Sequence, residues 1–210
     1  LCIGNVTTKV VGSCYKTKQI SLPMFIVSHY KSDYSWVKKY TDSFVVYHKD
    51  RVNVGYNIAS MMTFIIDNYE HLPDVCVFVK DNLLERHITL EEFEKVVNNT
   101  CFTPLLTQNH KVYEPVCRYK NGIYEELNDR WYFNSYPHKY ITNYNDFAYQ
   151  MGLDTPLYIP FAPGGNYIVP KENILKLKKD FYVKLLEFCS WSQINAESHV
   201  IERALYNIWK

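Results

Sequence analysis

The sequence predicts an α/β protein with a central mixed, mainly parallel sheet flanked by helices. Three short apolar runs rich in β-branched and aromatic residues, 23–27, 43–47 and 75–79, indicate buried strands. Apolar residues at helical spacing lie between them, over 33–40 and from Ile58 onward. Because strands that alternate with helices are joined by right-handed crossovers, we expect these three strands to run parallel.

The first strong helix follows Asn53-Val54-Gly55 and is defined by one apolar stripe. The members of the stripe are Ile58, Met61, Met62, Ile65 and Tyr69. We expect this helix to end near His71, because Pro73 cannot continue it. Another helix is expected over 90–97, with Thr89 as its N-cap and two glutamates in its first turn.

Residues 101–160 are rich in Tyr, Asn, Pro and His and show little periodicity. We therefore expect a long irregular insertion there, with one short strand at 131–133. At the other end of the chain, residues 1–22 alternate between polar and apolar and predict an edge extension or a hairpin.

The last fifty residues predict a strand and two helices. A strand is expected over 167–169, after the Gly164-Gly165 turn. Pro170 is expected to open a helix with one apolar face, formed by Ile174, Leu177, Phe181, Leu185 and Phe188. The final helix is expected over 196–209, with five apolar residues facing inward.

Composition predicts a single globular domain over residues 1–210 and excludes several classes of protein. The chain is 47% hydrophobic and 21% charged, which is typical of a folded domain. A net charge of +1 gives no basic field for a nucleic acid. The six cysteines form no C-x-x-C pair, which argues against structural zinc and favours free thiols in a reducing compartment. No apolar run approaches the roughly 20 residues of a membrane span, and no signal peptide is visible, so we expect a cytoplasmic protein.

Polar side chains follow each of the three predicted parallel strands, at 28–30, 48–51 and 80–82. Ligands of open α/β sheets bind outside the carboxyl ends of the strands, so we expect these clusters to converge. Asp81 would hold a divalent cation, Lys49 or Arg51 would lie near a phosphate, and Tyr30 would lie beside a base. The alternative is a set of ordinary polar turns and solvated charges.

Glycine-rich phosphate loops and the G-x-S-x-G elbow are absent from the sequence, which leaves a phosphate site built on a metal. On the final helix, Glu197, His199, Glu202 and Arg203 are clustered, and His199 and Arg203 share a face. One interpretation makes His199 a second metal ligand beside Asp81, a pair that suits Mn²⁺ better than Ca²⁺. The other interpretation is a solvated charged face.

Six short segments resemble GT-A-type glycosyltransferases and a related uncharacterised glycosyltransferase-like family. They are residues 27–30, 53–55, 68–74, 164–169, 180–182 and 199–203, and together they span most of the chain. The resemblance extends to viral members of the family, such as those of chlorella viruses, that modify a major capsid protein. It implies a GT-A-like, Rossmann-like fold, with a nucleotide-sugar-binding half over about 1–100 and an acceptor-side half over about 101–210.

The resemblance also implies an activity and a set of site residues. A hexose or deoxyhexose would move from a UDP-sugar, of the UDP-glucose or UDP-rhamnose type, to a glycan on a glycoprotein such as a capsid protein. A viral member would act in the host cytoplasm. Mn²⁺ or Mg²⁺ would bridge Asp81 and the diphosphate, with His199 as a further ligand. The residues expected to bind the donor are Ser28, His29, Tyr30, Arg51, Asn57 and Asp81.

The sequence departs from the GT-A pattern at two places. The usual Asp-x-Asp is replaced by Lys80-Asp81-Asn82, which offers one carboxylate, and Tyr56-Asn57 stands where relatives tend to have Arg-Glu. A single carboxylate keeps open a different function, a non-catalytic domain that binds a nucleotide sugar or carbohydrate at a degenerate metal site. A metal-dependent phosphohydrolase would need more carboxylates near the strand ends.

Transfer of a sugar requires charge stabilisation and, in an inverting enzyme, a base on the acceptor hydroxyl. Asp81 would act through the leaving diphosphate. Asp154, Glu197 and Glu202 are all candidates for the base, and the sequence does not choose between them. The acceptor is expected to lie against the 101–160 region, where Trp131, Tyr132 and Tyr158 offer aromatic faces for stacking.

Overall fold

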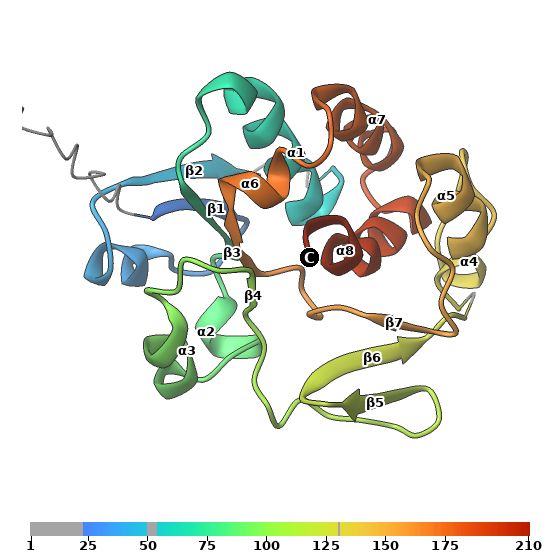
Figure 1. Ribbon diagram of the computed structural model, residues 1–210, viewed down its shortest axis with the longest axis horizontal. Coiled ribbons are helices and arrows are strands. Elements are labelled where there is room, and N and C mark those ends of the chain that lie inside the picture. Colours follow the sequence, from blue (N-terminus) through green and yellow to red (C-terminus); the bar gives the residue numbers. More distant parts are fainter. Residues whose placement is uncertain (1–22, 50–53, 130) are drawn as a thin grey trace, which may run out of the picture.

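The computed structural model describes residues 23–49, 54–129 and 131–210, so the expected extension over 1–22 lies outside the described residues. A five-stranded sheet forms its centre (Figure 1). The strands of this sheet are β1 (Met24–His29), β2 (Phe44–His48), β3 (Val75–Lys80), β4 (Thr103–Pro104) and β8 (Tyr167–Pro170).

The order of the strands in this sheet is β2-β1-β3-β8-β4. β1 pairs in parallel with β2 on one side and with β3 on the other. β8 runs antiparallel to β3, and β4 runs antiparallel to β8. The predicted mixed, mainly parallel sheet is therefore confirmed, and the parallel arrangement of its first three strands with it.

Both faces of the sheet are buried, which explains the continuous apolar runs in β1 and β3. In β3, Cys76 and Phe78 face one hydrophobic cluster, while Val75, Val77 and Val79 face another. Figure 1 shows the helices on the two sides. The first cluster is covered by α1 (Tyr56–Asn68), α7 (Lys179–Ser190) and α8 (Ala196–Trp209), and the second by a 3-10 helix (Ser35–Lys39), α2 (Leu83–Arg86) and α3 (Leu90–Val96).

The two longest helices of the first half, α1 and α3, begin and end close to where the sequence predicts. Gly55 is the N-cap of α1; its φ of 64° favours glycine, and a Cβ there would lie 2.8 Å from the Cys189 carbonyl oxygen. α1 continues into a 3-10 turn (Tyr69–His71) that ends just before Pro73. Thr89 and Glu92 form a capping box at the start of α3.

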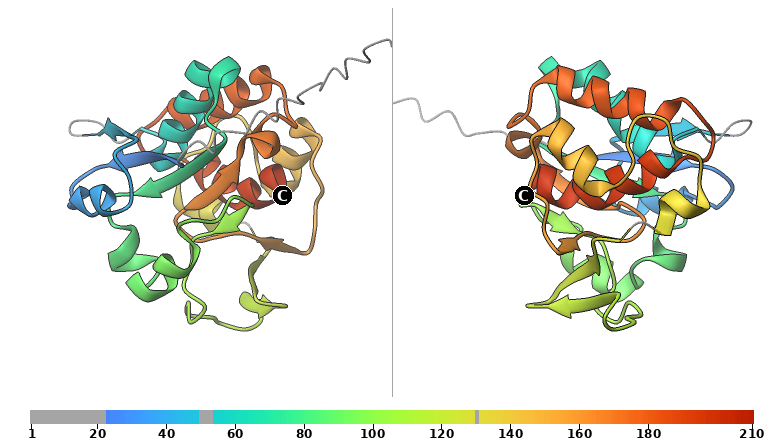
Figure 2. Two further views of the ribbon diagram at one scale, coloured as in Figure 1. Left: turned by 60° about the vertical axis from the view of Figure 1, so that its left-hand side comes forward. Right: turned by 90° about the vertical axis from the view of Figure 1, so that its right-hand side faces the viewer.

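The 101–160 region is more ordered than the sequence suggests. It contains β5 (Cys117–Lys120), β6 (Ile123–Leu127) and β7 (Tyr158–Pro160), which form a separate antiparallel sheet that Figure 2 shows at one end of the molecule. The expected strand at 131–133 is wrong, because these residues open helix α4 (Trp131–Ser135). Adjacent residues Tyr132 and Phe133 belong to the same hydrophobic cluster, whereas a strand would turn them to opposite faces. A further helix, α5 (Tyr144–Met151), precedes β7.

The helix expected from Pro170 is divided into two, α6 (Lys171–Ile174) and α7. At the break, two tyrosine hydroxyls donate to backbone carbonyl groups. The Tyr182 hydroxyl donates to the Ile174 carbonyl at 2.7 Å, and the Tyr69 hydroxyl donates to the Leu177 carbonyl at 2.6 Å. The final helix, α8, has the predicted bounds. Within the described ranges, none of the helices combines the length and the apolar character that a membrane crossing requires.

Candidate functional site

The carboxyl ends of β1, β2 and β3 meet at one edge of the sheet, and the structure brings together residues of all three polar clusters. His29 at the end of β1 lies edge-on to His48 at the end of β2, with ring centroids 5.1 Å apart. His29 Nδ1 also lies 3.2 Å from Oδ2 of Asp81, directly after β3. We call this region the carboxyl edge.

The carboxylate of Asp81 is enclosed by the loop that follows β1. Its Oδ2 accepts hydrogen bonds from the backbone N–H groups of Tyr30, Lys31 and Ser32 at 2.7, 3.0 and 3.0 Å. Its Oδ1 accepts from the N–H of Asn82 at 2.8 Å. Consecutive N–H groups that point at one oxygen form an anion-binding nest, and here the anion is the protein's own carboxylate. Asp81 therefore fastens the loop after β1 to the end of β3.

These hydrogen bonds also decide the charge of Asp81. Burial raises the pKa of this carboxyl, but the N–H groups of Tyr30, Ser32, Lys31 and Asn82 outweigh burial and hold the pKa below its usual range. The side chain is 4% exposed, so its charge is balanced mainly by these donors rather than by water.

The residues around Asp81 do not fit a divalent cation. Both carboxylate oxygens already accept hydrogen bonds, and His29 takes part in them. His199 packs instead against Tyr136, with ring centroids 4.5 Å apart, and against Tyr56. Across the described residues, no three His, Cys, Asp or Glu side chains are grouped so that they could hold a metal ion.

Two of the predicted donor-binding residues connect elements of the fold. The Ser28 hydroxyl lies 3.1 Å from the hydroxyl of Ser60, which joins β1 to α1. The Asn57 side-chain amide donates to the Gly164 carbonyl at 2.9 Å, which joins α1 to the turn before β8. Both residues are buried, so they shape the carboxyl edge from within.

Tyr30 is exposed at the carboxyl edge, whereas the ammonium of Lys49 is enclosed. Tyr30 is 40% exposed, and the Lys31 ammonium lies 4.8 Å from the centre of its ring. The Lys49 ammonium donates to the carbonyls of Val54 and Tyr56, at the start of α1. Burial lowers the pKa of Lys49 to about 8. Arg51, the other predicted phosphate contact, lies outside the described residues.

A second group of residues, three of them titratable, lies on the β8 side of the carboxyl edge. We call it the Lys80–Glu202 cluster, and it consists of Lys80, His87, Gly164 and Glu202. Lys80 ends β3, His87 follows α2, Gly164 belongs to the turn before β8, and Glu202 is on α8. His87 is packed so tightly on Gly164 that an added Cβ would lie 2.3 Å from the imidazole.

The Lys80–Glu202 cluster contains three groups with shifted pKa values. Burial raises the pKa of Glu202, against the opposing effects of Arg203, Lys80 and the Gly164 N–H. Burial lowers the pKa of Lys80, although Glu202 opposes this shift. Burial, with help from Lys80 and Arg86, lowers the pKa of His87 to about 4. Clustered shifts of this kind are typical of functional sites, although structural ion networks also produce them.

The other two candidate bases do not lie in this cluster. Glu197 is fully buried, and its Oε1 accepts from the N–H groups of Lys139 and Tyr140 at 2.7 and 2.9 Å. It anchors the segment before α5 to the start of α8. Asp154 is exposed on the connection between α5 and β7. Of the three candidates, only Glu202 adjoins the carboxyl edge.

The predicted stacking residues are largely occupied by protein contacts. Tyr132 is 1% exposed, and the Arg203 guanidinium lies 5.0 Å from its ring centre. Tyr158 is covered by the Arg118 guanidinium at 3.6 Å and donates its hydroxyl to the Pro115 carbonyl. The side chain of Trp131 lies outside the described part of the chain.

The sequence indicated this edge of the sheet but missed two of its residues. His87 is a single histidine after a one-turn helix, and no pattern distinguished it. Asn166 stands beside the Gly164-Gly165 turn in the sequence, but nothing there indicates that its buried side chain connects two strands. Its Oδ1 accepts from the backbone N–H of Lys80 at 2.8 Å, which ties β8 to the end of β3.

Comparison with protein families places the whole described fold in one of them. Residues 24–210 match the model of a family described as "Protein of unknown function (DUF3431)". The chain belongs to the DUF3431 family. The match begins with β1 and ends with α8, so both the carboxyl edge and the Lys80–Glu202 cluster lie within the DUF3431 match. No curated protein and no solved structure matches this DUF3431 chain.

Proposed function

We propose that the protein is a glycosyltransferase of GT-A-like architecture that binds a UDP-sugar at the carboxyl edge. It would transfer a hexose or deoxyhexose to a glycan acceptor. The observation that carries the proposal is the Lys80–Glu202 cluster, which places a lysine and a carboxyl with shifted pKa values beside the ends of the parallel strands. This is the place where open α/β sheets bind their ligands.

The two charged residues have complementary roles in this proposal. Lys80 would offset the negative charge that develops on the leaving diphosphate. Glu202 would accept the proton of the acceptor hydroxyl, because a carboxyl with a raised pKa is a better base than an ordinary one. Tyr30, which is exposed at the same edge, would offer its ring to the base of the nucleotide.

A second function has one specific observation in its favour. Asp81, the carboxylate at the position of the usual metal motif, is already engaged by backbone N–H groups and by His29. A domain that binds a nucleotide sugar without transferring the sugar would tolerate this arrangement. Binding and transfer must therefore be measured separately.

The first measurement is calorimetric titration of the protein with UDP, with and without Mn²⁺. We expect UDP to bind in both conditions, and we expect Lys80→Met to weaken binding about tenfold, or about 1.4 kcal/mol. Lys179→Met is the matched control, because this lysine is exposed at the start of α7 and should leave binding unchanged. UDP binding that requires Mn²⁺ would instead support the metal-bridged site at Asp81 that the sequence predicts. Absence of UDP binding in every condition would contradict both functions.

The second measurement is release of UDP from UDP-glucose and UDP-rhamnose in the presence of a glycan acceptor. Loss of a general base commonly lowers the rate about 10²- to 10⁴-fold, so we expect Glu202→Gln to lower kcat by at least about 100-fold. UDP affinity of this variant should change little. Tight UDP binding without release from either donor would favour the non-catalytic domain.

A further inference from the structure

A cavity of about 670 Å³ lies beyond the carboxyl edge, on the side of the smaller sheet. Its walls come from α3, from residues 104–109 and from the β5–β6 hairpin, which Figure 1 shows facing one another. Residues that line it include Thr89, Gln108, Asn109, Tyr119, Tyr124 and Phe161. Its volume is within the range of about 300–1,000 Å³ that is usual for ligand-binding pockets.

The wall on the α3 side is fixed by Glu92. Its carboxylate accepts hydrogen bonds from the Thr107 hydroxyl at 3.1 Å, from the Gln108 N–H at 3.0 Å and from the Thr89 hydroxyl at 2.8 Å. Burial raises the pKa of Glu92, but these hydrogen bonds outweigh it and lower the pKa to about 2. The segment at 107–108 is therefore held against α3 by the Glu92 carboxylate.

The wall on the hairpin side is fixed by aromatic contacts. The Tyr119 hydroxyl donates to the Thr107 carbonyl at 2.8 Å and accepts from the His110 N–H at 3.2 Å. The Tyr124 ring lies edge-on to the rings of Tyr119 and Phe161, at 5.7 and 5.5 Å between centroids. Both walls are thus built before any ligand arrives, as in most small-molecule sites.

The chemistry of the lining indicates the kind of ligand. Among the described residues that line the cavity, Lys95 is the only cation, and its ammonium is paired with the Glu91 carboxylate at 2.7 Å. An anionic ligand would therefore find no unpaired positive charge there. The remaining lining combines the carboxylates of Glu91 and Glu92, both already engaged by groups of the protein, with aliphatic and aromatic side chains and with neutral hydroxyl and amide groups. Rings pack against the C–H faces of sugars, and hydroxyl and amide groups pair with sugar hydroxyls.

We propose that this cavity is a binding site for a neutral saccharide. The inference does not depend on the proposed transfer reaction, because it rests on residues outside the carboxyl edge. The two regions are nevertheless neighbours. The Thr107 N–H donates to the His87 carbonyl at 2.7 Å, and His87 belongs to the Lys80–Glu202 cluster.

The test is titration of the full chain with neutral trisaccharides, measured by calorimetry and by ligand-observed NMR. The probes are maltotriose, cellotriose, mannotriose and N,N′,N″-triacetylchitotriose, and glucose 6-phosphate is compared with glucose. We expect at least one trisaccharide to bind and glucose 6-phosphate to bind no better than glucose. Gln108→Trp should weaken saccharide binding about tenfold or more, because the indole enters the cavity from an exposed position.

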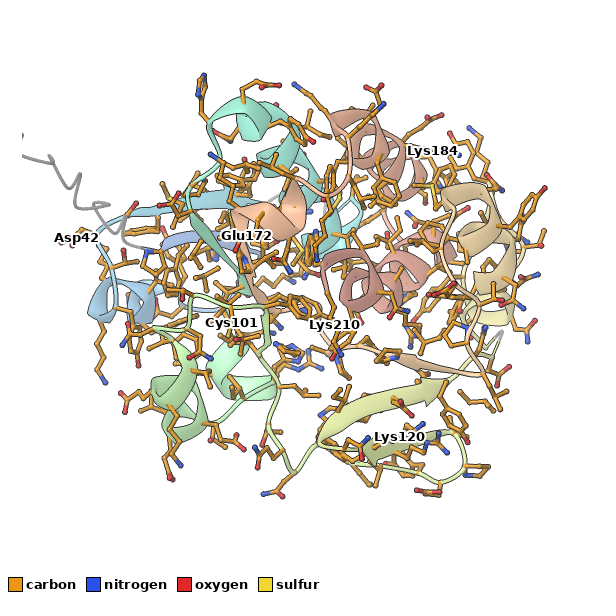
Figure 3. The ribbon with its side chains drawn as sticks, viewed as in Figure 1. Asp42, Cys101, Lys120, Glu172, Lys184 and Lys210 are labelled. Atoms are coloured by element: carbon orange, nitrogen blue, oxygen red, sulfur yellow. The ribbon has the colours of Figure 1, made fainter. Side chains whose placement is uncertain are left out.

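Lys120→Trp is the matched control, since Lys120 is an exposed residue at the end of β5 that does not line the cavity (Figure 3). Circular dichroism and thermal unfolding check that both variants fold. Failure of all four trisaccharides to bind would overturn the proposal, as would equal binding to Gln108→Trp and to the unchanged protein. Stronger binding of glucose 6-phosphate than of glucose, lost in Gln108→Trp, would also overturn it. UDP binding at the carboxyl edge is measured separately, so the two proposals can fail independently.

Discussion

Gly164 lies so close to the His87 imidazole that no side chain fits between them. An added Cβ would lie 2.3 Å from the ring, and the φ of this residue is +92°. We expect Gly164→Ala to lower the free energy of unfolding by about 2–4 kcal/mol, because it adds a clash to an unfavourable backbone conformation. Urea unfolding measures the loss.

Gly122 is the matched control for this clash. It also has a positive φ, of +76°, but a Cβ there would have nothing within 4 Å. Gly122→Ala should therefore lower the free energy of unfolding by only about 1–2 kcal/mol, the cost of placing alanine at a positive φ. Equal losses in the two variants would show that the contact between Gly164 and His87 does not constrain the site.

Individual site residues were predicted unevenly from the sequence. The place of Asp81 followed from the strand before it, because the end of a buried strand is visible as a change from apolar to polar residues. Its role did not follow, because its partners at 30–32 are fifty residues away and bind through backbone N–H groups. No side-chain pattern reports such contacts. His199 instead packs against the rings of Tyr136 and Tyr56, which are distant in the sequence, so its surroundings could not be predicted either.

The ion pair between Arg203 and Glu126 joins the final helix to the smaller sheet. The two side chains are 2.6 Å apart, with exposed fractions of 7% and 10%. The Arg203 guanidinium also lies 4.8 Å from the ring centre of Phe161. Removing one member of a buried pair leaves the other charge without its partner, so we expect Arg203→Met to cost about 3–5 kcal/mol.

The double variant Arg203→Met/Glu126→Leu distinguishes this mechanism from simple loss of packing. Removing both charges should cost less than removing Arg203 alone, because no buried carboxylate is left behind. Chemical denaturation of the four proteins in this cycle measures the coupling. A double variant less stable than Arg203→Met would contradict it.

Secondary structure was predictable where one element buries a regular face. α1, α3, α8 and the strands β1, β2, β3 and β8 follow from periodicity and caps. The small sheet could not be predicted in this way. Its strands have only three to five residues, which is too short for a periodic pattern of apolar residues to show. α4 was mistaken for a strand because Trp131-Tyr132-Phe133 favours strands locally. Packing of both Tyr132 and Phe133 into one hydrophobic cluster overrides that preference.

The stability of the whole molecule should depend on pH through two histidines, the buried His87 and the half-buried His199. Burial lowers the pKa of His87 and of His199 to about 4, and cationic neighbours contribute in both cases. In the unfolded chain these groups take up protons near pH 6.5. The free energy of unfolding should therefore be highest above pH 6.5, where both states hold the histidines neutral, and should fall as the pH decreases toward 4. The loss should be on the order of 3 kcal/mol for each histidine.

Urea unfolding at several pH values between 7 and 4 measures this dependence. His87→Gln should flatten the pH dependence of the unfolding free energy, whatever its effect on stability at pH 7. His71→Gln is the control, because His71 is exposed. An unchanged slope in His87→Gln would mean that this imidazole takes up its proton equally in the folded and unfolded chain.

At the scale of the fold, the nest at Tyr30, Lys31 and Ser32 has a consequence for any phosphate ligand. The Asp81 carboxylate is tethered to the chain, so its effective concentration at these N–H groups exceeds that of a free phosphate. A ligand would have to compete with it rather than fill an open position. The loop after β1 is thus preorganised by the protein itself, and the entropy of ordering it is lost during folding instead of during binding.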